Sequence, residues 1–425
     1  MRRLFSFFLS VLVLLTTGMV RCFAEKNNSA NAAAASEAGD LPAFSGLRIA
    51  VGSDLHLDPD NTDRSLGTQV AYNMELVDAL LWDAREQGAE MILLTGDIVN
   101  GGKPHRHEAL VAKLRHAEEE GLAVYVLPGN HDLAPSTQSD FARSYREFGY
   151  DEAYSRDESS LSYCVVRDRM MILMMDTGGY GVGAIDLPGA PNRTGSGPFF
   201  STGTLRWAEK MFQDAQEQGF LALAAGHYNL LPEISRQPGS GYCIENGERF
   251  LEMLKRYGVP LYLSGHMHTR YVYQEDGLTE LLTEYLLGYP TGYSLLDFRD
   301  RSITYTPRRI DVDTWAAETG QTDPILRNYA DWQQENLFRY SVSNIDYMSE
   351  RNPISDEEKG LAAGFFYTAM NSFWDGSLSE KRAAIEAMPG YEPFFRCAEG
   401  YAYGWWLKNL IETATPLLKG FTISW

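Results

Sequence analysis

The chain has 425 residues, and its 57 acidic against 37 basic side chains give a formal net charge of −20. An acidic surface repels nucleic-acid phosphates unless a local basic patch intervenes, and the sequence contains no such patch. We therefore expect no nucleic-acid binding, and solubility explains the acidity without a specific acidic role. The length suffices for one large domain and a smaller one.

The first 24 residues have the layout of a secretory signal peptide. Arg2 and Arg3 precede an apolar run from Leu4 to Leu15, and a small-residue cleavage site follows, ending at Ala24. An uncleaved membrane anchor is the alternative, but the run is shorter than the roughly 20 residues that a span needs. We expect an exported protein, extracellular, periplasmic or held at the cell surface, with no transmembrane segment in the mature chain.

Residues 25–45 are rich in Ala, Asn, Ser and Gly, which predicts a flexible leader because such a segment buries little apolar surface. Three cysteines follow the leader, Cys164, Cys243 and Cys397. They are widely spaced and odd in number, so at most one disulfide could form, and the pairing stays open.

Strands and helices then alternate, which favours a layered α/β fold. The expected strands are 47–52, 91–95, 123–127, 170–175, 220–225 and 260–264, and the expected helices are 68–88, 105–121, 201–219 and 246–258. Short β-type runs between 271 and 310 predict a closing antiparallel sheet. We place the catalytic domain at residues 46–310.

Residues 311–425 lose the strand pattern and are expected to form a mainly helical extension. Ser355 and Glu358 have the spacing of a capping box that opens a helix. This segment holds 17 acidic against 9 basic residues, which again disfavours nucleic-acid binding.

Potential metal ligands follow the strand-like runs, where the carboxyl ends of strands would bring them together. Carboxylate and neutral imidazole are ligands that divalent transition metals prefer. Alternate residues of an extended segment share a face, so Asp54 and His56, and likewise His266 and His268, could each grip one cation. The candidates are Asp54, His56, Asp97, Asn130, His131, Asp132, His227, His266 and His268.

Together these blocks (D-x-H, G-D, G-N-H-D, a single His and G-H-x-H) resemble the calcineurin-like metallophosphoesterase superfamily, and most closely its cyclic-nucleotide phosphodiesterase-like branch. The resemblance implies a four-layer α/β/β/α sandwich. It also implies two divalent transition-metal ions, Mn, Fe, Zn or Co. Asp54, His56 and His268 would hold one ion, Asn130, His227 and His266 the other, and Asp97 would bridge them.

The same resemblance implies that His131 binds no metal and acts as the general acid, and that a metal-bound hydroxide attacks phosphorus in line. The expected function is hydrolysis of phosphodiester bonds in a small phosphoester substrate. A secreted phosphomonoesterase or nucleotidase is the alternative, and a non-catalytic, metal-stabilised surface protein is the alternative of another class. The presence of His131 disfavours the last, since metal binding does not require it.

Two departures from the family pattern bear on the substrate. Gly226 stands where some relatives have a second His, so that substrate contact is either missing or supplied by Tyr228 or Asn229. Asn100 stands where the purple acid phosphatase branch has a tyrosine ligand, which argues against that branch.

The remaining polar and aromatic residues have less specific interpretations. We expect His105, His107 and His116 to be solvated, Asp176 to stabilise a turn, and Trp405 and Trp406 to belong to a helical core. Asp132 could orient His131 or stabilise its turn, and Arg270 could contact a phosphate or pair at the surface.

Overall fold

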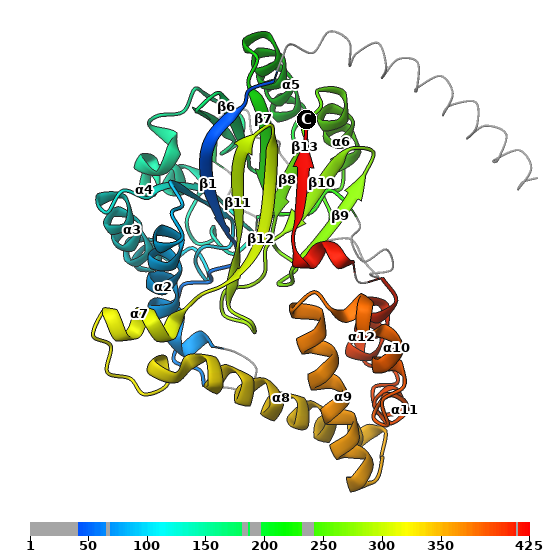
Figure 1. The fold of residues 1–425 in the computed structure, drawn as a ribbon. Helices are drawn as coiled ribbons and strands as arrows, with labels where there is room; N and C mark the ends of the chain where they lie inside the picture. The colour runs from blue at the N-terminus through cyan, green and yellow to red at the C-terminus, as the bar shows by residue number, and fades with distance from the viewer. Residues whose placement is uncertain (1–40, 65–68, 181–185, 188–196, 232–241, 414) are drawn as a thin grey trace, which may run out of the picture.

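The computed structural model describes residues 41–64, 69–180, 186–187, 197–231, 242–413 and 415–425 (Figure 1). The expected signal peptide, 1–24, and most of the leader, 25–45, lie outside the described residues. Among the helices that are described, none combines the length and apolarity needed to cross a membrane.

Two β-sheets form the centre of the molecule. The first has the strand order β13-β12-β11-β1-β2-β3, with β1, β2 and β3 parallel and the other neighbours antiparallel. Its strands are β1 (Phe44–Gly52), β2 (Met91–Thr95), β3 (Ala123–Leu127), β11 (Gly292–Asp300), β12 (Ser302–Arg309) and β13 (Phe421–Ser424).

The second sheet has the order β4-β5-β6-β7-β8-β10-β9, in which β6, β7, β8 and β10 are parallel neighbours. Its strands are β4 (Ser155–Arg156), β5 (Tyr163–Arg167), β6 (Met170–Met175), β7 (Leu221–Gly226), β8 (Leu261–Ser264), β9 (Tyr271–Glu275) and β10 (Leu278–Leu282).

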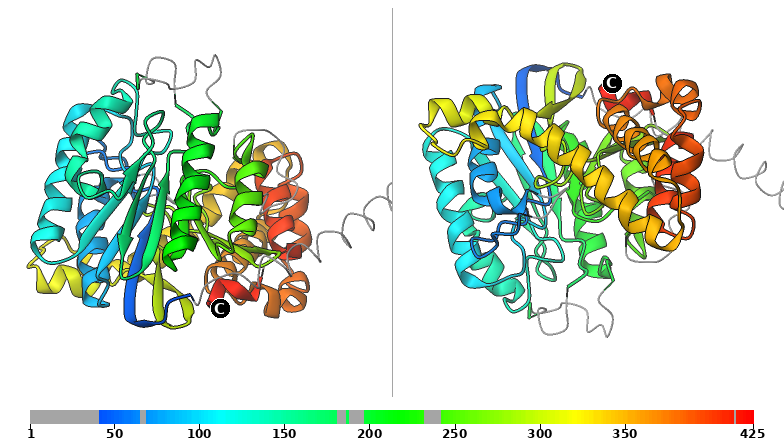
Figure 2. Two further views of the ribbon diagram at one scale, coloured as in Figure 1. Left: turned by 90° about the horizontal axis from the view of Figure 1, so that it is seen from above. Right: turned by 90° about the horizontal axis from the view of Figure 1, so that it is seen from below.

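The buried strand β6 shows how the layers stack. Met170, Ile172 and Met174 join the core between the sheets, whereas the alternate residues join a second core against α5 and α6. Helices α2 and α3 cover the outer face of the first sheet (Figure 2). This arrangement confirms the expected α/β/β/α sandwich, with α2 (Asn73–Glu86), α3 (Pro104–Glu119), α5 (Thr202–Gln218) and α6 (Gly247–Arg256); the short α4 (Gln138–Ser144) lies nearby.

Local sequence signals located most of these elements well. The expected strands 91–95, 123–127 and 170–175 coincide with β2, β3 and β6. Ser201 caps α5 by accepting a hydrogen bond from the Thr204 amide, and Gly219 ends that helix in the left-handed region. Hydrophobic runs bounded by Gly and capping residues therefore carry enough local information to define an element.

The expected single antiparallel sheet over 271–310 is wrong in its topology. The hairpin β9–β10 extends the second sheet, while β11–β12 extends the first. Residues between β10 and β11 cross from one sheet to the other, and Ser53 pairs with Tyr285 in that crossing. Alternating side chains indicate strands but not which neighbour each strand joins, because both hairpins bury one face in the same core.

Residues 311 onward are mainly helical, as expected. The capping box at Ser355 and Glu358 is confirmed at the start of α9. Sequence patterns missed that β13 returns to pair with β12. The helices are α7 (Val312–Glu318), α8 (Tyr329–Arg351), α9 (Asp356–Trp374), α10 (Leu378–Glu386), α11 (Tyr391–Cys397) and α12 (Ala402–Thr413).

Buried polar contacts join these helices to the sheets. Thr291 Oγ1 accepts a hydrogen bond from Gln333 Nε2 at 2.6 Å, and Tyr289 Oη donates to Asn371 Oδ1 at 2.6 Å. Arg270 is 3% exposed, forms an ion pair with Glu284, and donates to the carbonyl of Trp374 at 3.3 Å. Both expectations for Arg270, a phosphate contact and a surface pair, are therefore wrong.

The expectation that His107 is solvated is also wrong. His105 and His116 are exposed as expected, but His107 is only 3% exposed and shares a 2.8 Å hydrogen bond with the hydroxyl of Tyr145. Burial lowers the pKa of His107 to about 4, from an ordinary value of 6.5. The helix looked polar because charged residues surround His107 in sequence, yet His107 lies on the face that packs against Phe141 and Tyr145.

This burial makes folding stability depend on pH. Between pH 6.5 and 4 the unfolded chain protonates His107 while the folded chain does not, so stability falls as pH falls. Relative to wild type, His107→Gln should therefore be less destabilising at pH 4.5 than at pH 7, by about 2 kcal/mol. Urea unfolding at both pH values measures the free energy of unfolding of each variant. His116→Gln, on the exposed face of the same helix, is the control. A penalty that is equal at both values would contradict the expectation.

Candidate metal centre

The residues expected to bind metal meet at the carboxyl edge of both sheets. Five of the seven have a left-handed backbone, with φ of 50° at Asp54, 43° at His56, 48° at Asp97, 66° at His266 and 54° at His268. The extended D-x-H and H-x-H segments expected from the sequence are therefore wrong in conformation. The side chains still converge, because each pair turns back on itself where its strand ends.

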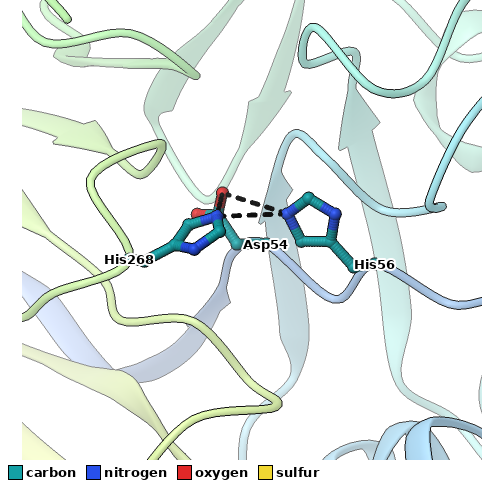
Figure 3. A group of neighbouring side chains, drawn as sticks. All are labelled: Asp54, His56 and His268. Carbon is teal, nitrogen blue, oxygen red and sulfur yellow. Dashed lines mark hydrogen bonds and ion pairs between the residues drawn. The ribbon is translucent and has the colours of Figure 1, made fainter. Parts of the chain in front are cut away.

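Asp54 is completely buried and uses its two oxygens differently. Its Oδ2 accepts hydrogen bonds from the Ser53 hydroxyl at 2.6 Å and the His266 amide at 2.9 Å. Its Oδ1 has no hydrogen-bond donor among the described residues. That oxygen lies 3.4 Å from His268 Nε2 and 3.8 Å from His56 Nε2, so the three side chains face a common point (Figure 3).

Asp97 has the geometry of a bridging carboxylate. Its Oδ1 accepts the His131 amide at 2.7 Å. Its Oδ2 lies 3.6 Å from His56 Nε2 on one side and 3.3 Å from His227 Nε2 on the other. One oxygen thus stands between the group around Asp54 and the group around His227.

The second group is arranged around His227, which is fully buried. Its Nδ1 donates to the carbonyl of Thr95 at 2.9 Å, which leaves Nε2 free to bind a cation. Nε2 lies 3.2 Å from Asn130 Oδ1. A ligand atom of His266 lies within 4.8 Å of those of His227 and Asp97.

The two carboxylates of this cluster also require positive charge nearby. Burial would raise the pKa of Asp54, but His268 and His56 hold it well below its ordinary value. Burial would likewise raise the pKa of Asp97, yet His227 lowers it to about 2. Two anionic carboxylates at such depth need a positive partner, which a metal ion or a protonated imidazole can supply.

Motif glycines allow this close packing. A Cβ atom at Gly96 would stand 2.7 Å from His227 Nδ1, and one at Gly129 would stand 2.3 Å from Asp97 Oδ1. A Cβ atom at Gly265 would meet the Ser53 hydroxyl at 1.8 Å. The glycines of the G-D, G-N-H-D and G-H-x-H blocks are therefore required by contact with the ligand side chains.

His131 stands at the exposed side of the cluster. Its ring packs edge-on against that of His56, with 4.7 Å between centroids. Asp132 does not touch the His131 ring; it accepts the backbone amides of Gly129 at 2.7 Å and Val99 at 2.8 Å. Of the two roles considered for Asp132, the structure therefore supports stabilisation of the turn.

Three aromatic contacts of the site were not expected. Tyr285 stacks on His268 with 4.4 Å between centroids, and Tyr228 packs on His266 at 4.2 Å. The ring of Tyr242 lies 5.7 Å from that of His266.

Two polar residues considered from the sequence face the protein. Asn229 is fully buried and donates to Ser264 Oγ at 3.0 Å, so it does not face a substrate. Asp176 accepts the amides of Leu161 and Gly178 and thus holds a turn, as expected.

These observations fit two divalent cations. A carboxylate oxygen without a donor, a second carboxylate between two imidazoles, and the His227 imidazole fixed through its other nitrogen form a suitable ligand set. The groups would be Asp54, His56 and His268 for one cation and Asn130, His227 and His266 for the other, with Asp97 shared. These assignments agree with the sequence-based roles and stay predictions.

Gly129→Ala tests whether the cluster binds metal. The added Cβ must displace the Asp97 carboxylate, so metal affinity should fall by roughly 10- to 100-fold, as for other changes behind a metal ligand. Gly364→Ala is the matched control, because a Cβ there meets nothing within 4 Å. Metal analysis after dialysis against chelator measures both, and equal metal content would contradict the assignment.

Solved structures with similar folds are distant from this chain. A dimetal phosphatase from Danio rerio is 13% identical, with 62% of this chain and 96% of that chain covered and a TM-score of 0.44. A purple acid phosphatase from yellow lupin is 12% identical, with 64% and 53% covered and a TM-score of 0.44. A "Putative 5'-Nucleotidase from Staphylococcus aureus" is also 12% identical, with 68% and 58% covered and a TM-score of 0.41. No curated protein matches the sequence.

Family models divide the chain into two matched parts. Residues 311–414 match a model described as the C-terminal domain of cyclic nucleotide phosphodiesterase. Residues 47–270, which hold every candidate metal ligand, match the calcineurin-like phosphoesterase model. This chain therefore belongs to the calcineurin-like phosphoesterase family of metal-dependent hydrolases.

Proposed function

We propose that the protein is an exported phosphodiesterase with a dinuclear metal centre. The position of His131 carries the proposal. Its imidazole is exposed, as is that of His268, and it stands beside a cluster whose other groups would suffice for both sets of ligands. An enzyme needs such a group to protonate the leaving oxygen, whereas a metal site that only stabilises a fold does not.

The chain's own residues would divide the work as follows. When bound, the two cations stabilise charge on phosphorus-bound oxygens and make water nucleophilic near neutral pH. Asp97 fixes the backbone of His131 through a 2.7 Å hydrogen bond, so the acid and the bridging ligand keep their relative position. Burial lowers the pKa of His131, although Asp97 acts in the opposite direction. Asn130 contributes an oxygen without adding negative charge beside an anionic substrate.

The match of residues 311–414 favours diesters over monoesters, because that model is described as a domain of cyclic nucleotide phosphodiesterase. The helical region also lies at the edge of the sheets where the candidate ligands meet (Figure 1). A substrate there would contact both parts of the chain, so the matched C-terminal region bears on what the site accepts.

His131→Ala should separate catalysis from metal binding. Loss of a general acid should lower kcat by roughly 10²- to 10⁴-fold, while metal content stays that of wild type. The loss should be larger for a ribose leaving oxygen than for a nitrophenolate, because a stabilised anion needs less protonation. Steady-state kinetics on a cyclic nucleotide and on an aryl diester, with metal analysis of the same samples, measures both effects.

Two results would contradict this proposal. Loss of one cation in His131→Ala would make His131 a ligand, which its place within 4.8 Å of His56 and Asp97 permits. Absence of metal-dependent hydrolysis of any diester by wild type would reject the phosphodiesterase itself.

Export rests on the N-terminal pattern and is tested separately. If residues 1–24 are a signal peptide, mass spectrometry of the protein released from the cells or their envelope should find Glu25 as the first residue. A protein that still begins at Met1 would indicate an uncleaved anchor or no export.

A further inference from the structure

A large aromatic pocket lies beside the candidate metal centre. It has a volume of about 890 Å³ and is lined by the C-terminal part of α11, the turn after it and the start of α12, together with Tyr242 from the other part of the chain. These helices lie at the end of the helical region away from α7 (Figure 1). The volume is within the usual range for small-molecule sites, roughly 300–1,000 Å³.

Tyr242 connects this pocket to the site of reaction. Its ring lies 5.7 Å from that of His266, a candidate ligand of the second cation, and it also lines the pocket. The side chain is 44% exposed. A molecule whose phosphoryl group sits on the metal centre could therefore extend past Tyr242 into the aromatic pocket.

The pocket combines fixed rings with available ones. Tyr403 is fixed, since its hydroxyl lies 2.5 Å from that of Tyr340 and its ring packs on Trp406 at 5.9 Å. The half-buried Trp405 differs from Tyr403 and Trp406 in its contacts. Across the described residues its indole stacks on no other ring and its N–H donates no hydrogen bond. Trp405, which packs partly against the main core as expected, and the exposed Tyr242 thus line the pocket beside the fixed ring of Tyr403.

The chemistry of the lining indicates what would bind. Tyr and Trp rings carry polar edges, and Glu399 and Lys408 add an acceptor and a donor at the border of the pocket. This combination suits a planar heteroaromatic group with polar edges better than an alkyl chain. Every nucleobase has a π-face that stacks on such rings, largely regardless of which base it is.

We propose that this pocket binds the nucleobase of the substrate, with Tyr242 and Trp405 as the residues that recognise it. The proposal rests on the proposed phosphodiesterase function and adds the residues that determine its specificity. In this arrangement the metal centre holds the phosphoryl group, and Tyr242 and Trp405 hold the base. The helical region then selects the substrate while the sheet edge performs the reaction.

A matched pair of substrates tests the proposal, namely adenosine 3′,5′-cyclic phosphate and ribose 3′,5′-cyclic phosphate without a base. Wild type should prefer the nucleotide in kcat/KM. Trp405→Ala and Tyr242→Ala should each reduce that preference by about tenfold or more, mainly through KM, because they remove stacking. Trp405→Phe and Tyr242→Phe should restore most of it.

Tyr154→Ala is the control, because Tyr154 is 47% exposed, similar to Tyr242, and lies outside the pocket. It should keep the wild-type preference. Equal losses on both substrates in the pocket variants would indicate a structural role and overturn the proposal. A wild-type enzyme that cleaves the abasic diester as well as the nucleotide would also overturn it.

A binding measurement separates this proposal from the proposed function. Calorimetry should show that wild type binds adenosine 5′-monophosphate at least about tenfold more tightly than ribose 5-phosphate, and that Trp405→Ala removes the difference. If wild type hydrolyses no diester but shows this difference, the function fails and the pocket assignment stands. Equal binding of the two compounds rejects the pocket assignment whatever the hydrolysis result.

Discussion

Two buried carboxylates set the constraint on which the rest of the structure depends. Asp54 and Asp97 are 0% and 1% exposed, and their histidine neighbours hold both pKa values low. An uncompensated charge at that depth would cost several kcal/mol, so the fold must supply positive partners at fixed positions. Imidazoles from three separate segments (His56, His227 and the His266–His268 segment) lie beside these carboxylates, and each segment must therefore end at the same edge of the sandwich.

The local conformation is the cost of that convergence. The left-handed backbone conformation at five ligand positions is strained, and such strain costs roughly 1–3 kcal/mol per residue. Asp and His tolerate this region better than branched residues do, so the residue types that bind metal also suit the turns that present them. Fully buried strands such as β2 and β6 form the sheets from which these turns extend and fix their positions.

The sequence was informative where the signal is local. Strand β6 and the cap at Ser201 follow from a few neighbouring residues, and the ligand blocks stand out because each ends an apolar run. The partners of the C-terminal hairpins could not be read in this way, because pairing depends on residues far along the chain. The burial of His107 against Tyr145 and the stacking of Tyr285 on His268 are also contacts between distant segments. No spacing rule reports such contacts.

The helical region is part of the sandwich and not merely an appendage to it. Strand β13 pairs with β12 after the last helix, so both ends of the region are anchored in the first sheet. Buried hydrogen bonds tie its interior to loops beside the metal ligands, including Gln333 to Thr291 and Arg270 to Trp374. A change in these helices therefore alters the surroundings of the candidate metal centre. If the helical region selects the substrate as proposed, this coupling would keep its rings at a constant distance from the candidate metal centre.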